Sequence, residues 1–213
     1  MNNIKKLLAS AAALVLAFGV MAALAGCGGG GSKGPSDEEL IKQNISTYME
    51  AFKDPTTAES QKILGDDIKS GLEQFDQYGI DGLDFIKHCF SRVEYDVTDV
   101  KVNGDKATAK VTITNLDLTA LLNAAGEELQ AWADTDAGLN ELMGASDPMK
   151  AIYAKMFEMF YAQIDSADMK TYGKTTEVTL NMVKKDGAWD IADTTDVNSF
   201  VSALYGGLDM SSL

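Results

Sequence analysis

Residues Val100 to Val111 read Val-Lys-Val-Asn-Gly-Asp-Lys-Ala-Thr-Ala-Lys-Val, and the topology of the chain follows from them. Valine and alanine alternate with lysine and threonine on both sides of Asn103-Gly104. Such alternation predicts strands with one apolar face, and Asn-Gly between two strands is typical of a tight hairpin turn. The sequence therefore predicts an antiparallel hairpin with one face on a core and the other in water.

Both strands of this hairpin extend beyond the quoted residues. The second strand continues its alternation through Ile113. The first strand changes phase near Thr98 and Asp99, which predicts a β-bulge at that point. The apolar positions on either side of the phase change are Val93, Tyr95 and Val97, then Val100 and Val102.

A second hairpin follows near the end of the chain. Its strands carry Val178, Leu180 and Met182 before the turn and Trp189 and Ile191 after it. The turn between them is Asp-Gly at residues 186 and 187, which again favours a tight hairpin. Two hairpins with one apolar face each predict a four-stranded antiparallel sheet that needs helices to cover it.

Helical patterns precede the first hairpin. Ser36 and Glu39 form a capping-box pattern, and the helix that they open should end near Asp54, before Pro55. A second helix is predicted over residues 57–78, loosened by Gly65 and Gly71, and a shorter third helix over residues 82–91.

A helical insertion of roughly fifty residues separates the two hairpins. Asp117 is the predicted cap of its first helix, whose apolar side runs from Leu118 to Trp132. Residues 134–138 predict a solvated acidic loop, and Asp147-Pro148 then opens another helix. A last helix, capped by Asp196, should end at the glycines at residues 206 and 207.

These patterns predict an α+β protein with a curved four-stranded antiparallel sheet wrapped by N-terminal helices. The helical insertion lies between the hairpins, and a helix closes the domain. Residues 36–213 form this single domain, since a chain of this length buries one ordinary core.

The N-terminal helices, the hairpin from Val100 to Val111 and the late Lys-Lys-Asp-Gly-Ala-Trp-Asp-Ile from Lys184 to Ile191 resemble a family. It comprises bacterial lipoproteins built on a fold like nuclear transport factor two, also called cystatin-like. The resemblance implies a sheet curved into a cone that often holds an open pocket. The helical insertion and the last helix depart from the minimal fold, at places where they would fill or roof the cone.

The N-terminus agrees with a lipoprotein. Lys5 and Lys6 precede an apolar run from Leu7 to Leu24, which is the layout of a secretory signal peptide. Leu-Ala-Gly-Cys at residues 24–27 resembles the lipobox of bacterial lipoproteins. That resemblance implies a thioether-linked diacylglyceryl group on Cys27, with acyl chains such as palmitate, and cleavage just before it. An uncleaved transmembrane helix is the alternative, because the run of 18 residues also reaches the length of roughly 17 to 25 that spans a bilayer.

The processed chain would begin with a tether. Residues 1–26 are the expected signal peptide, and residues 27–35 hold the lipidated cysteine and a Gly-rich linker. Random-coil scaling gives the eight linker residues after Cys27 a span of roughly 16 Å. We expect a location on the outer face of a cytoplasmic membrane, with two acyl chains sufficient for stable anchoring.

Charge excludes one class of partner. The chain has a formal charge of −14, and removing residues 1–26, with two lysines and no acid, leaves 16 basic and 32 acidic residues, or −16. Such a surface repels phosphate backbones, so nucleic-acid binding is excluded. The expected partners are the membrane, through the lipid, and an envelope protein or a small ligand. The domain itself is expected to be a monomer.

Most catalytic chemistry is missing from the sequence. One histidine and one spare thiol exclude a structural zinc site, and no Gly-x-Ser-x-Gly or phosphate-binding glycine motif is present. With Cys27 lipidated, Cys89 pairs with no other cysteine and should be buried and inert. Asp134 to Gly138 begins like a calcium loop but has glycine at the fifth position and Ala145 at the twelfth. We therefore predict no metal, no cofactor and no catalytic residues.

Two groups of residues are candidates for binding. Asp84, His88 and Arg92 stand four residues apart, and they include the only histidine and the only arginine of the chain. They predict either an anion-binding group at the mouth of the cone or ion pairs at helical spacing. The second group lies in the helix that Pro148 opens, whose apolar side covers roughly 200° of arc. Its central members are Met156, Phe157, Phe160 and Tyr161.

That broad apolar side has two readings. Either the helix is packed between two layers, or it lines a pocket or meets a partner. The leading hypothesis is a membrane-anchored extracytoplasmic lipoprotein that presents a non-catalytic ligand-binding or protein-binding domain. The alternatives are an enzyme of hydrolase or isomerase type with a cone-shaped pocket, and a structural spacer in the envelope.

Overall fold

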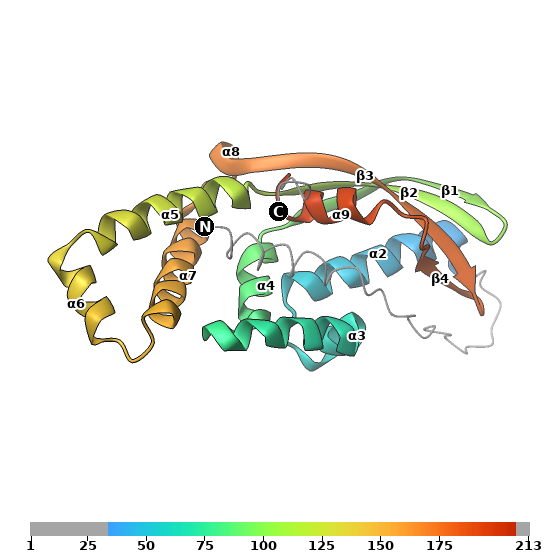
Figure 1. Ribbon diagram of the computed structural model, residues 1–213. Helices are drawn as coiled ribbons and strands as arrows, with labels where there is room; N and C mark the ends of the chain where they lie inside the picture. The colour runs from blue at the N-terminus through green and yellow to red at the C-terminus, as the bar shows by residue number, and fades with distance from the viewer. Residues whose placement is uncertain (1–33, 208–213) are drawn as a thin grey trace.

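The computed structural model describes residues 34–207 (Figure 1). The expected signal peptide, Cys27 and the linker up to residue 33 lie outside the described residues. The strands are β1 (Glu94–Asn103), β2 (Lys106–Leu116), β3 (Gly173–Lys185) and β4 (Ala188–Ile191). The helices before the sheet are α2 (Asp37–Lys53), α3 (Ala58–Leu72) and α4 (Gly82–Phe90), with the 3-10 helix η1 (Glu73–Tyr78) between α3 and α4. The later helices are α5 (Leu118–Ala133), α6 (Asp136–Gly144), α7 (Pro148–Ser166), α8 (Met169–Tyr172) and α9 (Val197–Leu204).

The four strands form one antiparallel sheet in the order β1-β2-β3-β4. Both predicted hairpins are present, and the register of β1 against β2 shifts between Val97 and Asp99, which confirms the bulge. β3 begins at Gly173, earlier than its apolar alternation indicated. Its first residues are polar and pair with the end of β2, where the hydroxyls of Thr114 and Thr175 lie 2.8 Å apart. The α+β fold predicted from the sequence is confirmed.

One face of the sheet carries the core. Its apolar side chains are buried along the two central strands, at Ala107, Ala109, Val111 and Ile113 of β2 and at Val178, Leu180 and Met182 of β3. α2 packs against β1 and β4, and α9 packs against β2 and β3. The opposite face is formed largely by threonine and charged residues, as the alternation predicts.

Side-chain caps fix most of the helix starts. The predicted capping box of α2 is present, with the Ser36 and Glu39 side chains each accepting from the other residue's backbone N–H. Asp117, Asp147 and Asp196 accept backbone N–H groups at the starts of α5, α7 and α9, as predicted. These caps supply acceptors for N–H groups that have no partner inside their helix.

Two segments differ from the prediction. The single helix expected over residues 57–78 is interrupted at Gly65, where φ is 79°, and its end is the separate 3-10 helix η1. A positive φ is open to glycine, so Gly65 breaks the helix rather than loosening it. The prediction of an acidic loop at residues 134–138 is wrong as well. Thr135 caps α6, its hydroxyl oxygen accepting the Gly138 N–H at 3.0 Å, so the helix begins at Asp136.

The helical insertion forms an arm, defined here as α5, α6 and α7 (residues 118–166). In Figure 1 it projects from the sheet at the end opposite the start of α2 and the strand β4. α5 and α7 pack against each other, and α6 joins them. The base of the arm is closed where the Asp117 N–H donates to the Tyr172 carbonyl at 2.7 Å and the Lys174 ammonium lies 2.6 Å from the Asp117 carboxylate.

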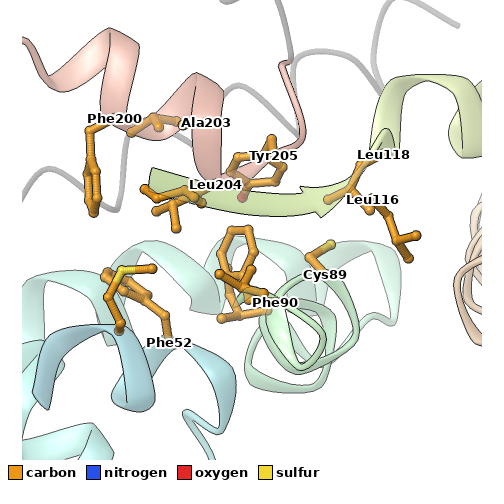
Figure 2. Close-up of a cluster of buried hydrophobic side chains, with 14 of the residues drawn as sticks. Phe52, Cys89, Phe90, Leu116, Leu118, Phe200, Ala203, Leu204 and Tyr205 are labelled. Carbon is orange, nitrogen blue, oxygen red and sulfur yellow. The ribbon is translucent and has the colours of Figure 1, made fainter. Parts of the chain in front are cut away.

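A buried cluster lies where α4, β2 and α9 meet. Figure 2 shows Phe90 of α4 facing Tyr205 just after α9, and their rings meet edge to face with centroids 4.8 Å apart. Cys89 lies beside them and is buried, as predicted. Burial raises the pKa of its thiol well above the ordinary value, which keeps it protonated and poorly reactive.

Asn115 holds this junction together. Its side chain is fully buried, and its amide nitrogen donates to the carbonyls of Cys89 at 3.0 Å and Leu204 at 2.5 Å. Its amide oxygen accepts the Leu116 N–H at 2.8 Å. Carbonyls in the last turn of a helix have no N–H partner within that helix. One side chain of β2 therefore caps the C-terminal ends of α4 and α9 together.

Candidate functional site

The structure brings the two candidate groups from the sequence together at the contact between α4 and α7. The imidazole of His88 stacks on the phenol ring of Tyr161, with centroids 4.0 Å apart and planes 8° from parallel. His88 Nδ1 lies 3.0 Å from the Asp84 carbonyl and 3.5 Å from the Asp84 carboxylate. The contact between Asp84 and His88 at helical spacing is present, and a ring-on-ring contact between the two helices accompanies it.

Arg92 lies beyond the last residue of α4, so it does not continue the helical face of Asp84 and His88. Its Nη1 donates to the carbonyls of Ile164 at 3.1 Å and Ala167 at 2.6 Å. These carbonyls belong to the C-terminal end of α7, which Arg92 caps as Asn115 caps α4 and α9. The guanidinium thus fastens the arm to the segment that leads into β1.

The apolar group of α7 faces the interior. Met156, Phe157 and Phe160 are buried, and Tyr161 is half-buried. The ring of Phe157 packs edge to face against Phe85 of α4, with centroids 5.7 Å apart. This geometry accounts for the wide apolar arc of α7, because the helix contacts both α4 and α5. A binding role for these seven candidate residues stays a prediction.

A hollow that the sequence analysis missed lies at the other end of the sheet. It occupies about 580 Å³ between the tip of the β1–β2 hairpin, the end of β3 and the segment after β4. That size is ordinary for a small-molecule site. We call it the lysine hollow after Lys101, Lys106 and Lys185. Its other lining residues are Asn103, Ala107, Thr108, Asn181, Met182, Val183, Ala192, Asp193 and Thr194.

One wall of the lysine hollow is held by Asn181 of β3. Its side-chain amide donates to the Thr194 carbonyl at 2.8 Å, and its backbone carbonyl accepts the Ala192 N–H at 2.7 Å. The buried Thr195 hydroxyl donates to the same carbonyl at 3.0 Å and accepts the Asn181 N–H at 3.0 Å. These hydrogen bonds hold the segment after β4 against β3. This wall of the hollow is therefore formed by hydrogen-bonded backbone.

The charges in the hollow oppose those of the whole chain. Three lysines and one carboxylate, Asp193, line it, whereas the chain carries −14. Lys101 is partly neutralised by Asp99, whose carboxylate lies 3.1 Å from its ammonium group. Burial raises the pKa of nearby Asp190, and the positive charge of Lys185 partly offsets that rise. The hollow is a local cationic site on an acidic protein.

The lining combines two kinds of contact. The ammonium groups and the Asn103 amide are suited to bind an anion by charge and hydrogen bonding, and the half-buried side chain of Val183 offers apolar contact. The site has a single carboxylate, so it lacks the paired acids of a glycosidase-like centre. Among residues 34–207, no three His, Cys, Asp or Glu side chains gather as a metal site would require.

A signal for this site was present in the sequence. Lysines flank both hairpin turns, as Lys101 and Lys106 around Asn103-Gly104 and as Lys185 before Asp186-Gly187. The turns of two hairpins in one four-stranded meander lie at the same end of the sheet, where the strands reverse direction. Pairing the two turns by topology would have placed these lysines together.

Comparisons with known proteins add little to this geometry. A scan against models of protein families finds no match, and a search of curated proteins finds none. Among solved structures, the chain is similar to a crystal structure from Bacillus subtilis subsp. subtilis strain 168, described as a candidate lipoprotein, ycdA. The two chains are 13% identical with a TM-score of 0.48, over 79% of this chain and 59% of that one. This chain thus spans less than two thirds of the length of that protein.

Within residues 34–207, no helix combines the length and the apolar character that crossing a membrane requires.

Proposed function

We propose that the chain is an extracytoplasmic lipoprotein, anchored to the membrane through a lipid on Cys27, whose domain binds a small organic anion in the lysine hollow. The binding is non-catalytic. The kinship with cystatin-like lipoproteins belongs to the same proposal. It rests on the N-terminal helices, the hairpin from Val100 to Val111 and the residues from Lys184 to Ile191.

The anchoring part of the proposal is supported by the N-terminal residues. Two lysines, an apolar run and Leu-Ala-Gly-Cys at residues 24–27 follow one another as in a lipoprotein precursor. The Gly-rich residues after Cys27 would hold the domain near the lipid without fixing its orientation. The start of α2 lies close to β4, because the Asp37 carboxylate accepts from the Lys184 ammonium at 2.6 Å and the Trp189 indole at 2.9 Å. The tether therefore enters the domain at the end that holds the lysine hollow.

The binding part rests on one observation, the convergence of Lys101, Lys106 and Lys185 on a hollow of about 580 Å³ in a chain of charge −14. In a protein of net negative charge, a local cluster of unpaired acids is repelled by the other acids. A local cluster of lysines is disfavoured less, because the surrounding acids attract it. A bound anion would satisfy these lysines, and its apolar part would cover Val183. A carboxylate on a short hydrocarbon chain fits this description.

Anchoring is tested by mass spectrometry of the natural product. A diacylglyceryl modification on an N-terminal Cys27 is the expected result, and Cys27→Ser should leave the precursor uncut. An unmodified thiol at that position, or normal processing of the variant, would refute the lipid anchor. Binding in the hollow would not depend on this result, because the hollow lies wholly in the folded domain.

Binding is tested with octanoate and acetate as probes, followed by NMR shifts of the hollow's backbone amides in the full chain. Octanoate should bind more tightly than acetate, since each buried methylene adds about 0.8 kcal/mol. Lys106→Gln combined with Lys185→Gln should weaken octanoate binding. Lys170→Gln is the matched control, because Lys170 is exposed on α8 and away from the hollow.

Equal binding by all of these variants, or shifts confined to other residues, would refute the hollow as the site. Turnover of a bound ester or sugar substrate would favour the enzyme alternative. A domain that binds neither probe while it remains membrane-anchored would favour the spacer.

A further inference from the structure

The tip of the arm exposes apolar side chains. Five large apolar residues of the described chain are exposed, and three of them lie within eleven consecutive residues of this tip. They are Leu139 at 48% exposure, Met143 at 85% and Met149 at 55%. These three residues form the arm tip. Apolar side chains gathered at one end of a projecting element are typical of a contact surface.

The arm tip is built on fixed backbone. Leu139 and Met143 stand four residues apart on α6, so they lie on one side of that helix. Leu142 of the same helix is half-buried, and α6 packs against both α5 and α7. The Thr135 hydroxyl closes the turn between α5 and α6 by donating to the Trp132 carbonyl at 2.7 Å. Methionine side chains on such a support adapt to a partner while the backbone stays in place.

Charge around the arm tip is mostly negative. From Leu118 to Met149 the chain has no lysine, arginine or histidine, and the exposed Lys150 follows directly. The same residues contain six exposed acids, which are Glu127, Glu128, Asp134, Asp136, Glu141 and Asp147. An apolar surface surrounded by six acids and one lysine complements a partner that carries apolar side chains and positive charge.

We propose that the arm tip docks a basic amphipathic segment of another protein. Anionic membrane lipid is not the occupant, because the six acids would face its negative surface. A second copy of this chain is not the occupant either, since the two tips would bring like charges together. The tip also lies at the end of the domain opposite the start of α2, where the proposed tether joins the domain (Figure 1). It is therefore far from the point of attachment and open to a partner in the envelope.

The test uses the mature chain, lipidated at Cys27, in nanodiscs of neutral lipid. The probe is a synthetic amphipathic helix of leucine and lysine with a photo-crosslinking group, and a leucine and glutamate helix serves as its acidic counterpart. Affinity is measured against salt concentration, and the crosslinked residues are located by mass spectrometry. Binding of the probe to lipid is common to all variants, so the comparison between variants removes it.

The basic helix should bind and crosslink at residues 139–149, and the acidic helix should not. Leu139→Ser with Met143→Ser should weaken binding by about tenfold or more, as loss of central apolar anchors does at other interfaces. Tyr172→Ser is the apolar control, because Tyr172 is exposed on α8 outside the arm. All of these positions are exposed, and circular dichroism checks that each variant is folded.

A charge pair of variants separates docking from general attraction to an acidic protein. Asp134→Asn with Glu141→Gln, at the tip, should reduce both the affinity and its salt dependence. Glu73→Gln with Glu94→Gln, exposed in η1 and β1, should change neither by a comparable amount. Equal effects of the two pairs, equal binding of the acidic helix, or crosslinks outside the tip would overturn the proposal. Self-association that Met143→Ser abolishes would overturn it too, because the occupant would then be a second copy.

Discussion

Replacing Asn115 with alanine should unfold the junction of α4, β2 and α9 at lower denaturant than any surface change. The side chain is fully buried and makes three hydrogen bonds, two to terminal helix carbonyls and one from the Leu116 N–H. A buried hydrogen bond contributes about 1 kcal/mol net, so the three together contribute about 3 kcal/mol. The two carbonyls are left without this donor in a site closed to water, which places the loss at the upper end of that scale.

Urea unfolding of the full chain, followed by circular dichroism, measures this loss. For a domain of this size about 3 kcal/mol lowers the melting temperature by roughly 6 to 12 °C. Asn123→Ala is the matched control, because Asn123 is exposed on α5 and its loss should change stability by less than about 0.5 kcal/mol. A destabilisation by Asn115→Ala of less than about 1 kcal/mol, at an unchanged denaturant slope, would refute the account of the junction.

Three further predictions concern the same end of the fold and the sheet edge. Gly206→Ala should destabilise the domain by about 1 to 3 kcal/mol in urea unfolding, because φ is 67° and a Cβ would overlap the Leu116 carbonyl; Gly104→Ala, with φ of 61° and open space around it, should cost less. Asp190→Asn should raise stability at pH 7, because burial raises the pKa of this carboxyl, and the gain should shrink as acid protonates the natural residue. In maleimide labelling the Cys89 thiol should react only after unfolding, and rapid labelling of the native protein would contradict its burial.

Local chemistry explains why so much of the fold was predictable. The hairpin turns, the bulge near Thr98 and the aspartate caps are each set by a few neighbouring residues, so a single sequence contains them. The break at Gly65 was missed, and the start of α6 was wrongly predicted as a loop. In both places the same residue types occur in turns and in the first turn of a helix. Asp136 and Gly138 read as a loop until Thr135 is seen as a cap.

The candidate site depended on contacts that sequence spacing does not contain. His88 and Tyr161 were predicted in separate groups, and only the packing of α4 on α7 stacks their rings. Arg92 was assigned to the face of α4 because it stands four residues after His88. The helix ends at Phe90, and the guanidinium follows the turn to the end of α7 instead. The lysine hollow required the pairing of two hairpins that are far apart in the chain.

The capping contacts also connect the two proposed surfaces. The arm follows β2 in the chain and is followed by β3, and these two strands are neighbours in the sheet. Both ends of the arm therefore lie at one pair of strands. Arg92 binds the end of α7, and Asp117 joins the start of α5 to Tyr172 and Lys174. Contacts at both ends of the arm restrain its movement against the sheet. These contacts also restrain the distance between the arm tip and the lysine hollow. A ligand in the hollow would affect partner binding at the tip only through this base and through the packing of α7 on α4.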